Sequence, residues 1–230
     1  MPNMPKSLQL LKLLKLLQLS SPTLPVGAFA YSQGLESAVE TGLIIDAETT
    51  QHCLEDSLRY SLQPTDVPLF SRLYQAWRDN DREQVNHWNQ FLQAQRETKE
   101  LRAEDHQLGI ALARLLFDLG ITEAQAWKKN PKTCFLTLFT LAAVKWNISL
   151  EEACTGYLWS WLDNQIVAAI KLVPLGQTDG QKVLSNTIEL IPDIIRKGLL
   201  IKTAEIGASL PMLAILSAQH ETQYSRLFRS

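Results

Sequence analysis

The sequence predicts an all-α fold, a single globular bundle of roughly eight to ten helices spanning residues 1–230. Apolar residues recur at every third or fourth position through most of the chain, for example at Leu54, Leu58 and Leu62. The alternation of apolar and polar residues that marks a half-buried strand is not sustained anywhere, and no Asn-Gly or Asp-Gly turn joins two β-rich runs. No repeat and no low-complexity linker divides the chain.

Composition narrows the function. The chain has 230 residues, of which 46% are hydrophobic, so it can bury a substantial core. The 22 basic and 24 acidic residues nearly cancel, which argues against a nucleic-acid-binding surface as the main function. Cys53, Cys134 and Cys154 form no CxxC pair and are expected to be inert core thiols in a reducing compartment.

Residues 1–20 are predicted to form an N-terminal Leu-rich helix. Lys12 and Lys15 interrupt its apolar run, whereas the apolar core of a secretory signal is unbroken. We therefore expect an amphipathic helix that packs on the domain or binds a partner, and a cytoplasmic protein. No segment reaches the ~18 uninterrupted apolar residues that a membrane span needs, so no membrane association is expected.

The next helices are predicted from caps and apolar stripes. Asp46 is expected to cap a helix with apolar residues up to Leu62. A second stripe runs from Leu69 to Trp77, with Pro68 in its first turn. Further apolar stripes cover residues 85–92 and 101–119, and Gly120 is expected to end the latter helix.

Ser149 and Glu152 form the sequence pattern of a capping box. The helix that they open can continue to Val173, where Pro174 stops it. Its apolar residues cover most of the circumference, so we predict a central, buried helix.

The C-terminal third continues the helical pattern. Residues 179–197 are expected to be helical, with a break near Pro192. Ser209 is expected to cap a final helix that has Pro211 in its first turn.

The sequence lacks motifs for metal or nucleotide binding by this chain alone. Its histidines show no i, i+4 pairing, so we expect them to be solvated or hydrogen-bonded; a site shared across a dimer interface stays open. Residues 175–182 resemble a phosphate loop only superficially. Three residues instead of four separate Gly176 from Gly180, and Val183 follows Lys182 where Ser or Thr would bind magnesium.

A serine hydrolase is the alternative function. Residues 30–34 are a variant of the G-x-S-x-G nucleophile elbow, with Ser32 as the nucleophile. The strand that must precede such an elbow is missing, so we expect no enzyme activity. The simpler role for Ser32 is to cap a helix that continues to Thr41, with Gly42 just beyond its end.

Two further segments have two interpretations each. The run of alternating charges at residues 96–105 is typical of a solvated helix face with pairs such as Arg96–Glu100, each worth ~0.3 kcal/mol, or of a charged docking face. The C-terminal tail, residues 223–230, is rich in aromatic and arginine residues, unlike most chain ends. It either packs on its own domain or contacts a partner, because Tyr and Arg are enriched in interface hot spots.

Four segments together resemble the UreF family of urease accessory proteins. They are residues 16–36, the Arg96–Glu104 run, residues 164–181 from Asn164-Gln165 to the Pro174–Gln181 corner, and residues 220–230. They occur in the family's order along nearly the whole chain.

The resemblance implies an all-α, non-catalytic homodimer. Such proteins bind the accessory protein UreD (UreH in some systems), and the pair recruits the GTPase UreG. The assembly delivers nickel to the apo-urease subunits, and UreF is thought to influence when UreG hydrolyses GTP. The chain alone would then bind no cofactor, because nickel and GTP are handled by the assembled complex.

The resemblance also assigns roles to residues. Gly27, Gly34, Gly176 and Gly180 are expected to serve backbone conformation. The expected UreD-type contact is Tyr224, Ser225, Arg226, Leu227, Phe228, Arg229 and Ser230; the expected UreG-type contact is Lys171, Pro174, Gly176, Gln177, Asp179 and Gln181; structural or contact roles fall to Tyr31, Ser32, Gln33, Gly34, Glu36, Arg96, Glu97, Arg102 and Glu104.

Overall fold

The computed structural model describes residues 6–208 and 210–230, and within these ranges it contains helices and no strand, which confirms the all-α prediction. The α-helices are α1 (Lys6–Leu19), α2 (Leu35–Glu40), α3 (Ala47–Ser57), α4 (Val67–Arg78), α5 (Arg82–Gln95), α6 (Lys99–Asp118), α7 (Phe135–Lys145), α8 (Leu150–Leu172), α9 (Gln177–Ile188), α10 (Ile191–Gly198) and α11 (Pro211–His220). A π-helical segment, η2 (Leu58–Asp66), and the 3₁₀ turns η1 (Ala28–Ala30), η3 (Thr122–Trp127) and η4 (Thr203–Glu205) complete the described part of the chain.

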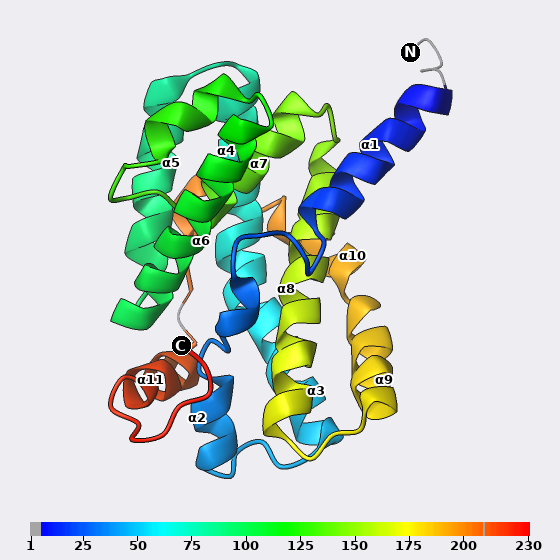
Figure 1. Ribbon diagram of the computed structural model, residues 1–230, viewed down its shortest axis with the longest axis vertical. Coiled ribbons are helices and arrows are strands. Elements are labelled where there is room, and N and C mark those ends of the chain that lie inside the picture. The colour runs from blue at the N-terminus through cyan, green and yellow to red at the C-terminus, as the bar shows by residue number, and fades with distance from the viewer. Residues whose placement is uncertain (1–5, 209) are drawn as a thin grey trace.

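The helix α8 is central, as predicted (Figure 1). Helices α9 and α10 lie on one side of it, α4 to α7 on the other, and α2 and α11 at the lower end of the view. The predicted capping box is present, because the Ser149 hydroxyl accepts the Glu152 N–H and the Glu152 side chain accepts the Ser149 N–H. Val173 is the C-cap, where the sequence places the end of the helix.

Helices α3 and α4 are joined by η2 into one continuous rod, whereas the sequence predicts two helices. The backbone of the residues that flank η2 stays helical at both ends. Pro64 lies within η2 and has no N–H to donate, and its carbonyl accepts the Gly207 N–H at 3.1 Å. Because α3 and α4 form one rod, the described residues contain ten helical rods, within the predicted eight to ten.

Most predicted helix ends are confirmed. The Asp46 carboxylate accepts the Thr49 N–H at the start of α3. Gly120 follows α6 with a φ of 91°. A break separates α9 from α10 just before Pro192, and Pro211 opens α11. The predicted cap Ser209 lies outside the described residues.

Of the four glycines assigned to backbone conformation, two meet that expectation. Gly27 and Gly34 have φ angles of 85° and 84°, where L side chains are strained. For Gly176 and Gly180 the prediction is wrong: Gly176 has a φ of −70°, and Gly180 lies within α9. A Cβ on Gly180 would lie 2.6 Å from the Ile170 Cδ1 atom, so this glycine serves the close packing of α9 on α8.

The core is one large cluster with a smaller one at the lower end of α8. In the large cluster the ring of Phe139 packs edge-on against Phe70, with centroids 6.1 Å apart, and against Tyr157 at 5.5 Å. All three cysteines are free thiols; Cys134 and Cys154 are buried, and Cys53 is half-buried. Burial raises the pKa of the Cys53 thiol to about 11, and burial also raises the pKa of the other two thiols.

Helix α1 extends from the body at the upper right of Figure 1. Its C-terminal Leu19 is buried, but the leucines before it are largely exposed, with Leu10 at 61% and Leu14 at 62%. None of the helices in the described ranges combines the length and the apolar character that crossing a membrane requires.

Helices α6 and α7 approach closely at Gly109. A Cβ there would lie 2.8 Å from the Cys134 carbonyl carbon and 3.0 Å from the Phe135 nitrogen. Next to this contact the Asp105 carboxylate accepts the Phe135 N–H at 2.9 Å, at the start of α7. The small residue therefore lets α6 supply a cap for α7.

Gly109→Ala should destabilise the protein, although alanine favours helix by ~1 kcal/mol over glycine. The methyl group would press on backbone atoms that cannot rotate away, so we expect a net loss of about 1–3 kcal/mol in the free energy of unfolding, measured in urea. Arg114→Ala, on the exposed face of α6, is the control and should change it by less than ~0.5 kcal/mol. Equal stability of both variants would contradict the packing argument.

Candidate functional site

The C-terminal tail folds back on its own domain, where the four family-like segments come together. It lies beside α2 and the loop before it, at the lower left of Figure 1. The Arg229 N–H donates to the Ala30 carbonyl at 2.8 Å, and the Ser32 N–H donates to the Ser230 carbonyl at 2.7 Å. We call residues 30–36 with Glu100, Glu104 and His220 the tail site.

Glu36 binds the tail backbone. Its carboxylate accepts the N–H groups of Leu227 at 2.7 Å and Phe228 at 2.9 Å. The side chain lies in the first turn of α2 and is only 7% exposed. A buried carboxylate with two N–H donors is a strong anchor, because such charge-assisted bonds exceed neutral ones in strength.

Phe228 is 6% exposed and belongs to the smaller core cluster, with Ala168, Ala169 and Val173 of the α8 end. The Lys171 Nζ atom lies 5.7 Å from the centroid of its ring. Of the two interpretations of the tail, packing on its own domain therefore holds for Phe228.

The other tail residues divide between inward and outward positions. Arg226 donates to the Glu100 carboxylate at 2.9 Å, so its carboxylate partner is also on its own chain. The Ser230 hydroxyl donates to Glu104 at 3.1 Å. Tyr224 is fully exposed and Leu227 is 65% exposed. The exposed residues of the predicted UreD-type contact are Tyr224, Ser225, Arg226, Leu227 and Arg229.

Gln33 joins the loop to α6 and α8. It is one of the described non-glycine residues with positive φ, at 53°. Its amide donates to Glu104 at 2.8 Å and accepts from the Trp161 indole N–H at 2.8 Å. Desolvation by burial raises the pKa of the Glu104 carboxyl to about 7, although the hydrogen bonds from Gln33 and Ser230 oppose this.

Neighbouring loop residues are also tied to other helices. The Tyr31 hydroxyl donates to Gln107 at 2.7 Å, and the Asn164 amide donates to the Tyr31 carbonyl at 3.2 Å. At Gly34, with its positive φ, a Cβ would lie 3.3 Å from the Ser217 nitrogen in α11. These contacts give Tyr31 and Gly34 structural roles within the chain.

Ser32 does not have the surroundings of a nucleophile. Its side chain is fully buried, and its hydroxyl donates to the Ser230 carbonyl at 2.6 Å. The hydroxyl also accepts the Glu36 N–H at 3.4 Å, close to the predicted capping role, but α2 begins at Leu35 and ends at Glu40 rather than Thr41. No strand precedes it in the described residues, so the hydrolase alternative is not favoured.

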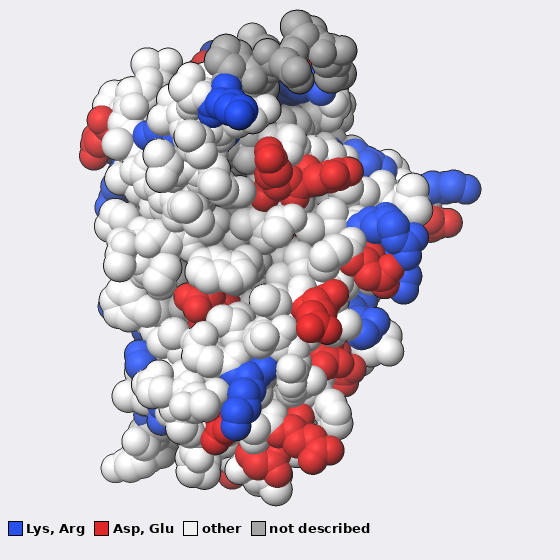
Figure 2. Space-filling model, turned by 90° about the vertical axis from the view of Figure 1, so that its right-hand side faces the viewer, with Lys and Arg blue, Asp and Glu red and all other residues white. Residues whose placement is uncertain are grey.

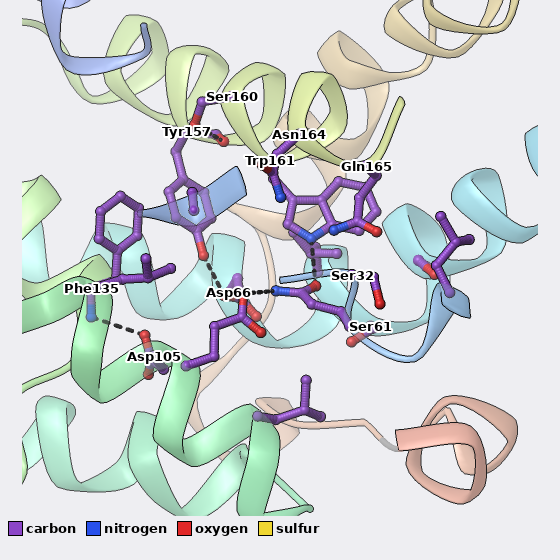
Figure 3. A pocket seen from close by; sticks show the side chains of 18 of the residues that line it. Ser32, Ser61, Asp66, Asp105, Phe135, Tyr157, Ser160, Trp161, Asn164 and Gln165 are labelled. Atoms are coloured by element: carbon purple, nitrogen blue, oxygen red, sulfur yellow. Dashed lines mark hydrogen bonds between the residues drawn. The ribbon is translucent and has the colours of Figure 1, made fainter. Parts of the chain in front are cut away.

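The predicted solvated face at residues 96–105 is wrong for most of its charges. Arg96 lies ahead of α6 in an extended conformation, so it cannot pair with Glu100 along a helix. Its guanidinium instead binds Asp66 of η2 with two hydrogen bonds, at 2.7 and 3.0 Å, and lies 3.5 Å from Asp105. Figure 3 shows Tyr157 of α8 pointing toward Asp66, to which its hydroxyl donates at 2.8 Å.

Three charged residues of that run remain at the surface. Arg102 is exposed and donates to the carbonyl oxygens of Arg96 at 2.7 Å and Glu97 at 3.2 Å. Glu97 and Lys99 are the other exposed charged residues.

His220 is a site residue that the sequence analysis did not select. It is fully buried at the end of α11, where Nδ1 lies 2.8 Å from Glu100 and Nε2 lies 3.1 Å from Glu36. The expectation of a hydrogen-bonded histidine is confirmed. Its presence beside Glu221 at the start of the tail segment was the available signal, but its partners are 120 and 184 positions away.

The residues of the expected UreG-type contact gather at the turn from α8 to α9. Lys171, Pro174, Gly176, Gln177 and Gln181 are exposed there, and Asp179 pairs with Lys182 at 2.9 Å. Through the Lys171–Phe228 contact this corner adjoins the tail. Figure 2, which views α9 and α10 directly, shows charges of both signs interspersed over that face.

A cavity of about 190 Å³ lies beside the tail site (Figure 3). Its lining includes Ser32, Asp66, Glu104 and Trp161. The buried polar atoms Ser20 Oγ, Thr65 Oγ1 and Gln165 Nε2, also in this lining, have no hydrogen-bond partner in the protein. Within the described ranges no group of three or more His, Cys, Asp and Glu side chains is arranged to hold a metal ion.

Glu104→Gln should remove part of the pH dependence of stability. Because burial raises the pKa of Glu104 from 4.5 to about 7, folding favours its neutral form. Below pH 4.5 the carboxyl group is neutral in the folded and in the unfolded protein. As the pH rises from 4.5 to about 7, the unfolded protein releases this proton first, so the free energy of unfolding falls by on the order of 3 kcal/mol. Urea unfolding at pH 5 and pH 8 should show a smaller difference for the variant. An unchanged difference would contradict the prediction.

Comparisons with known proteins identify the family of the chain. The UreF family model matches residues 44–187, more than half of the chain. The urease accessory protein UreF of Alkalilimnicola ehrlichii is 50% identical over 212 residues, covering 92% of this chain and 93% of that protein. The proteins of the same name from Hahella chejuensis and Teredinibacter turnerae are 49% and 46% identical, again over 92% of this chain and over 95% and 96% of their own. The chain therefore belongs to the UreF family of urease accessory proteins.

Proposed function

We propose that this chain is a scaffold that bridges a UreD (UreH)-type accessory protein and a UreG-type GTPase during nickel insertion into apo-urease. In this proposal it acts in the cytoplasm as a homodimer and catalyses no reaction. It binds no cofactor alone, since the assembled complex handles nickel and GTP. The observation that carries the proposal is the tail, which displays exposed apolar side chains from a site built of buried ion pairs.

The tail supports a role in partner binding because its inward residues fix its outward ones. Phe228 and Ser230 are buried, while Tyr224 and Leu227, which precede them in the chain, stay in solvent. Hydrogen bonds that the tail donates to Glu36 and Glu100 hold this segment, so a partner would not have to order it. Preorganisation of this kind raises affinity, because less conformational entropy is lost on binding.

The corner at residues 171–181 supports a second contact. It lies at the exposed turn between two packed helices and touches the tail through Lys171. Two partners bound at the tail and at the corner would therefore be neighbours, as bridging requires. The uncovered leucines of α1 offer apolar area for a homodimer or partner interface.

The double variant Tyr224→Ala with Leu227→Ala should weaken binding of the UreD-type partner without unfolding the protein. If these side chains form a hot spot, the loss is ~2 kcal/mol or more, roughly thirtyfold in affinity, measured by calorimetry. Because both side chains are exposed, the melting temperature should change little.

The matched control is Phe228→Ala. It removes a buried ring and should lower the melting temperature by several degrees, since ~1 kcal/mol shifts a chain of this size by ~2–4 °C. If the double variant bound the UreD-type partner with wild-type affinity, the proposed tail contact would be wrong.

Lys171→Ala should weaken recruitment of the UreG-type GTPase more than binding of the UreD-type partner. The exposed ammonium group of Lys171 at the end of α8 contacts the Phe228 ring and is also open to solvent, so it is available for an acidic partner surface. Co-purification with both partners measures the effect, with Lys197→Ala on α10 as a control of equal charge. Lower thermal stability with unchanged recruitment would show that Lys171 serves only its own helix.

A further inference from the structure

His220 lies between two carboxylates that both hold the tail. Its Nδ1 atom is 2.8 Å from Glu100 Oε2, and its Nε2 atom is 3.1 Å from Glu36 Oε2. The other oxygen of Glu100 accepts from Arg226 at 2.9 Å. Glu36 accepts the N–H groups of Leu227 and Phe228. The imidazole thus joins α2, α6 and the tail at one buried point.

The geometry fixes how many protons this arrangement needs. An ionised carboxylate only accepts hydrogen bonds, and a neutral imidazole has only one N–H to donate. A neutral ring would therefore place a nitrogen lone pair against a carboxylate oxygen at one of its two contacts. Only the imidazolium form of His220 can donate to both Glu36 and Glu100.

The charge balance leads to the same requirement. With His220 protonated, its charge and that of Arg226 balance the charges of Glu36 and Glu100. Without that proton, one negative charge remains uncompensated in a site where His220 is 0% exposed and Glu36 is 7% exposed. An unpaired buried charge is strongly destabilising.

We propose that docking of the tail is linked to the protonation of His220. The docked tail requires the imidazolium, whereas release of the tail opens the site to water and removes this requirement. An exposed histidine loses its proton at about pH 6.5, so release would be favoured as the pH rises above neutral. Release would expose Phe228 and leave Leu227 without a fixed position. The protonation of His220 would therefore control the tail surface, whatever partner binds it.

The remaining charged groups near the tail must be separated from His220 in any test. Glu36 of α2 and Glu100 of α6 face the imidazole directly, and Arg226 of the tail donates to Glu100 and to the His220 backbone carbonyl. Glu104 of α6 binds Ser230 and changes its protonation in the same direction, since burial raises its pKa to about 7. A Glu104→Gln background removes that contribution.

The test follows the amide proton shifts of Leu227 and Phe228 by NMR between pH 5.5 and 8.5, on the full chain. Both amides donate to a carboxylate when the tail is docked, so their downfield shifts report docking. In Glu104→Gln the docking equilibrium constant should fall by up to tenfold per pH unit across the transition, and in the wild type the fall should be at least as steep. A tail that stays docked over this range in both proteins would overturn the proposal.

Two variants isolate the imidazole. Both variants are made in the Glu104→Gln background. Glu100→Gln can donate an amide N–H to the neutral ring while its oxygen still accepts from Arg226, so its tail should stay docked without a pH transition. His220→Gln, which can donate at only one of the two contacts, should have a released tail at every pH. If Glu100→Gln kept the wild-type transition, the proposal would be wrong even if His220→Gln failed to fold.

Discussion

The hydrogen bonds of the Glu36 carboxylate to the tail hold the C-terminal segment against α2. This carboxylate lies near the start of the folded domain and accepts hydrogen bonds from backbone groups more than 190 positions later. Because the carboxylate is buried, it must be fully paired, and the tail and His220 are what pair it. The position of α11 follows from this need, since Gly34 lets its backbone approach α2 closely.

A second buried ion pair organises the other side of the site. Arg96 can reach Asp66 because the π-helical segment η2 carries that aspartate toward α6 and α8. π-Helical turns often occur at functional sites, where they alter the direction of side chains without ending the helix. Here the turn lies within a rod of the core, so the Arg96–Asp66 pair and the cavity beside it are fixed by the same packing.

Local patterns in the sequence predicted most of the helices, but they could not predict which residues pair over long distances along the chain. The caps at Asp46 and Ser149 and the central position of α8 follow from residues within one helical turn or one helix. The alternating charges after Arg96 looked solvated because a helical pattern shows only neighbours three or four positions away. Their actual partners, such as Asp66 and His220, are 30 and 120 positions away. The sequence pattern placed Pro68 in the first turn of a separate helix; Pro68 does lie in the first turn of α4, but the π-helical segment before it joins α4 to α3.

In the tail, the exposed side chains keep their positions only because their neighbours are buried. Its last residues alternate, with Leu227 and Arg229 exposed and Phe228 and Ser230 buried. In such a segment the outward side chains have a defined position only while the inward ones are bound. Any change in the hydrogen bonds between the tail and Glu36, Glu100 or Glu104 therefore alters the position of the Leu227 side chain, although that side chain takes no part in them. The charges buried under the tail and the side chains that it exposes to solvent therefore both depend on whether the tail is docked.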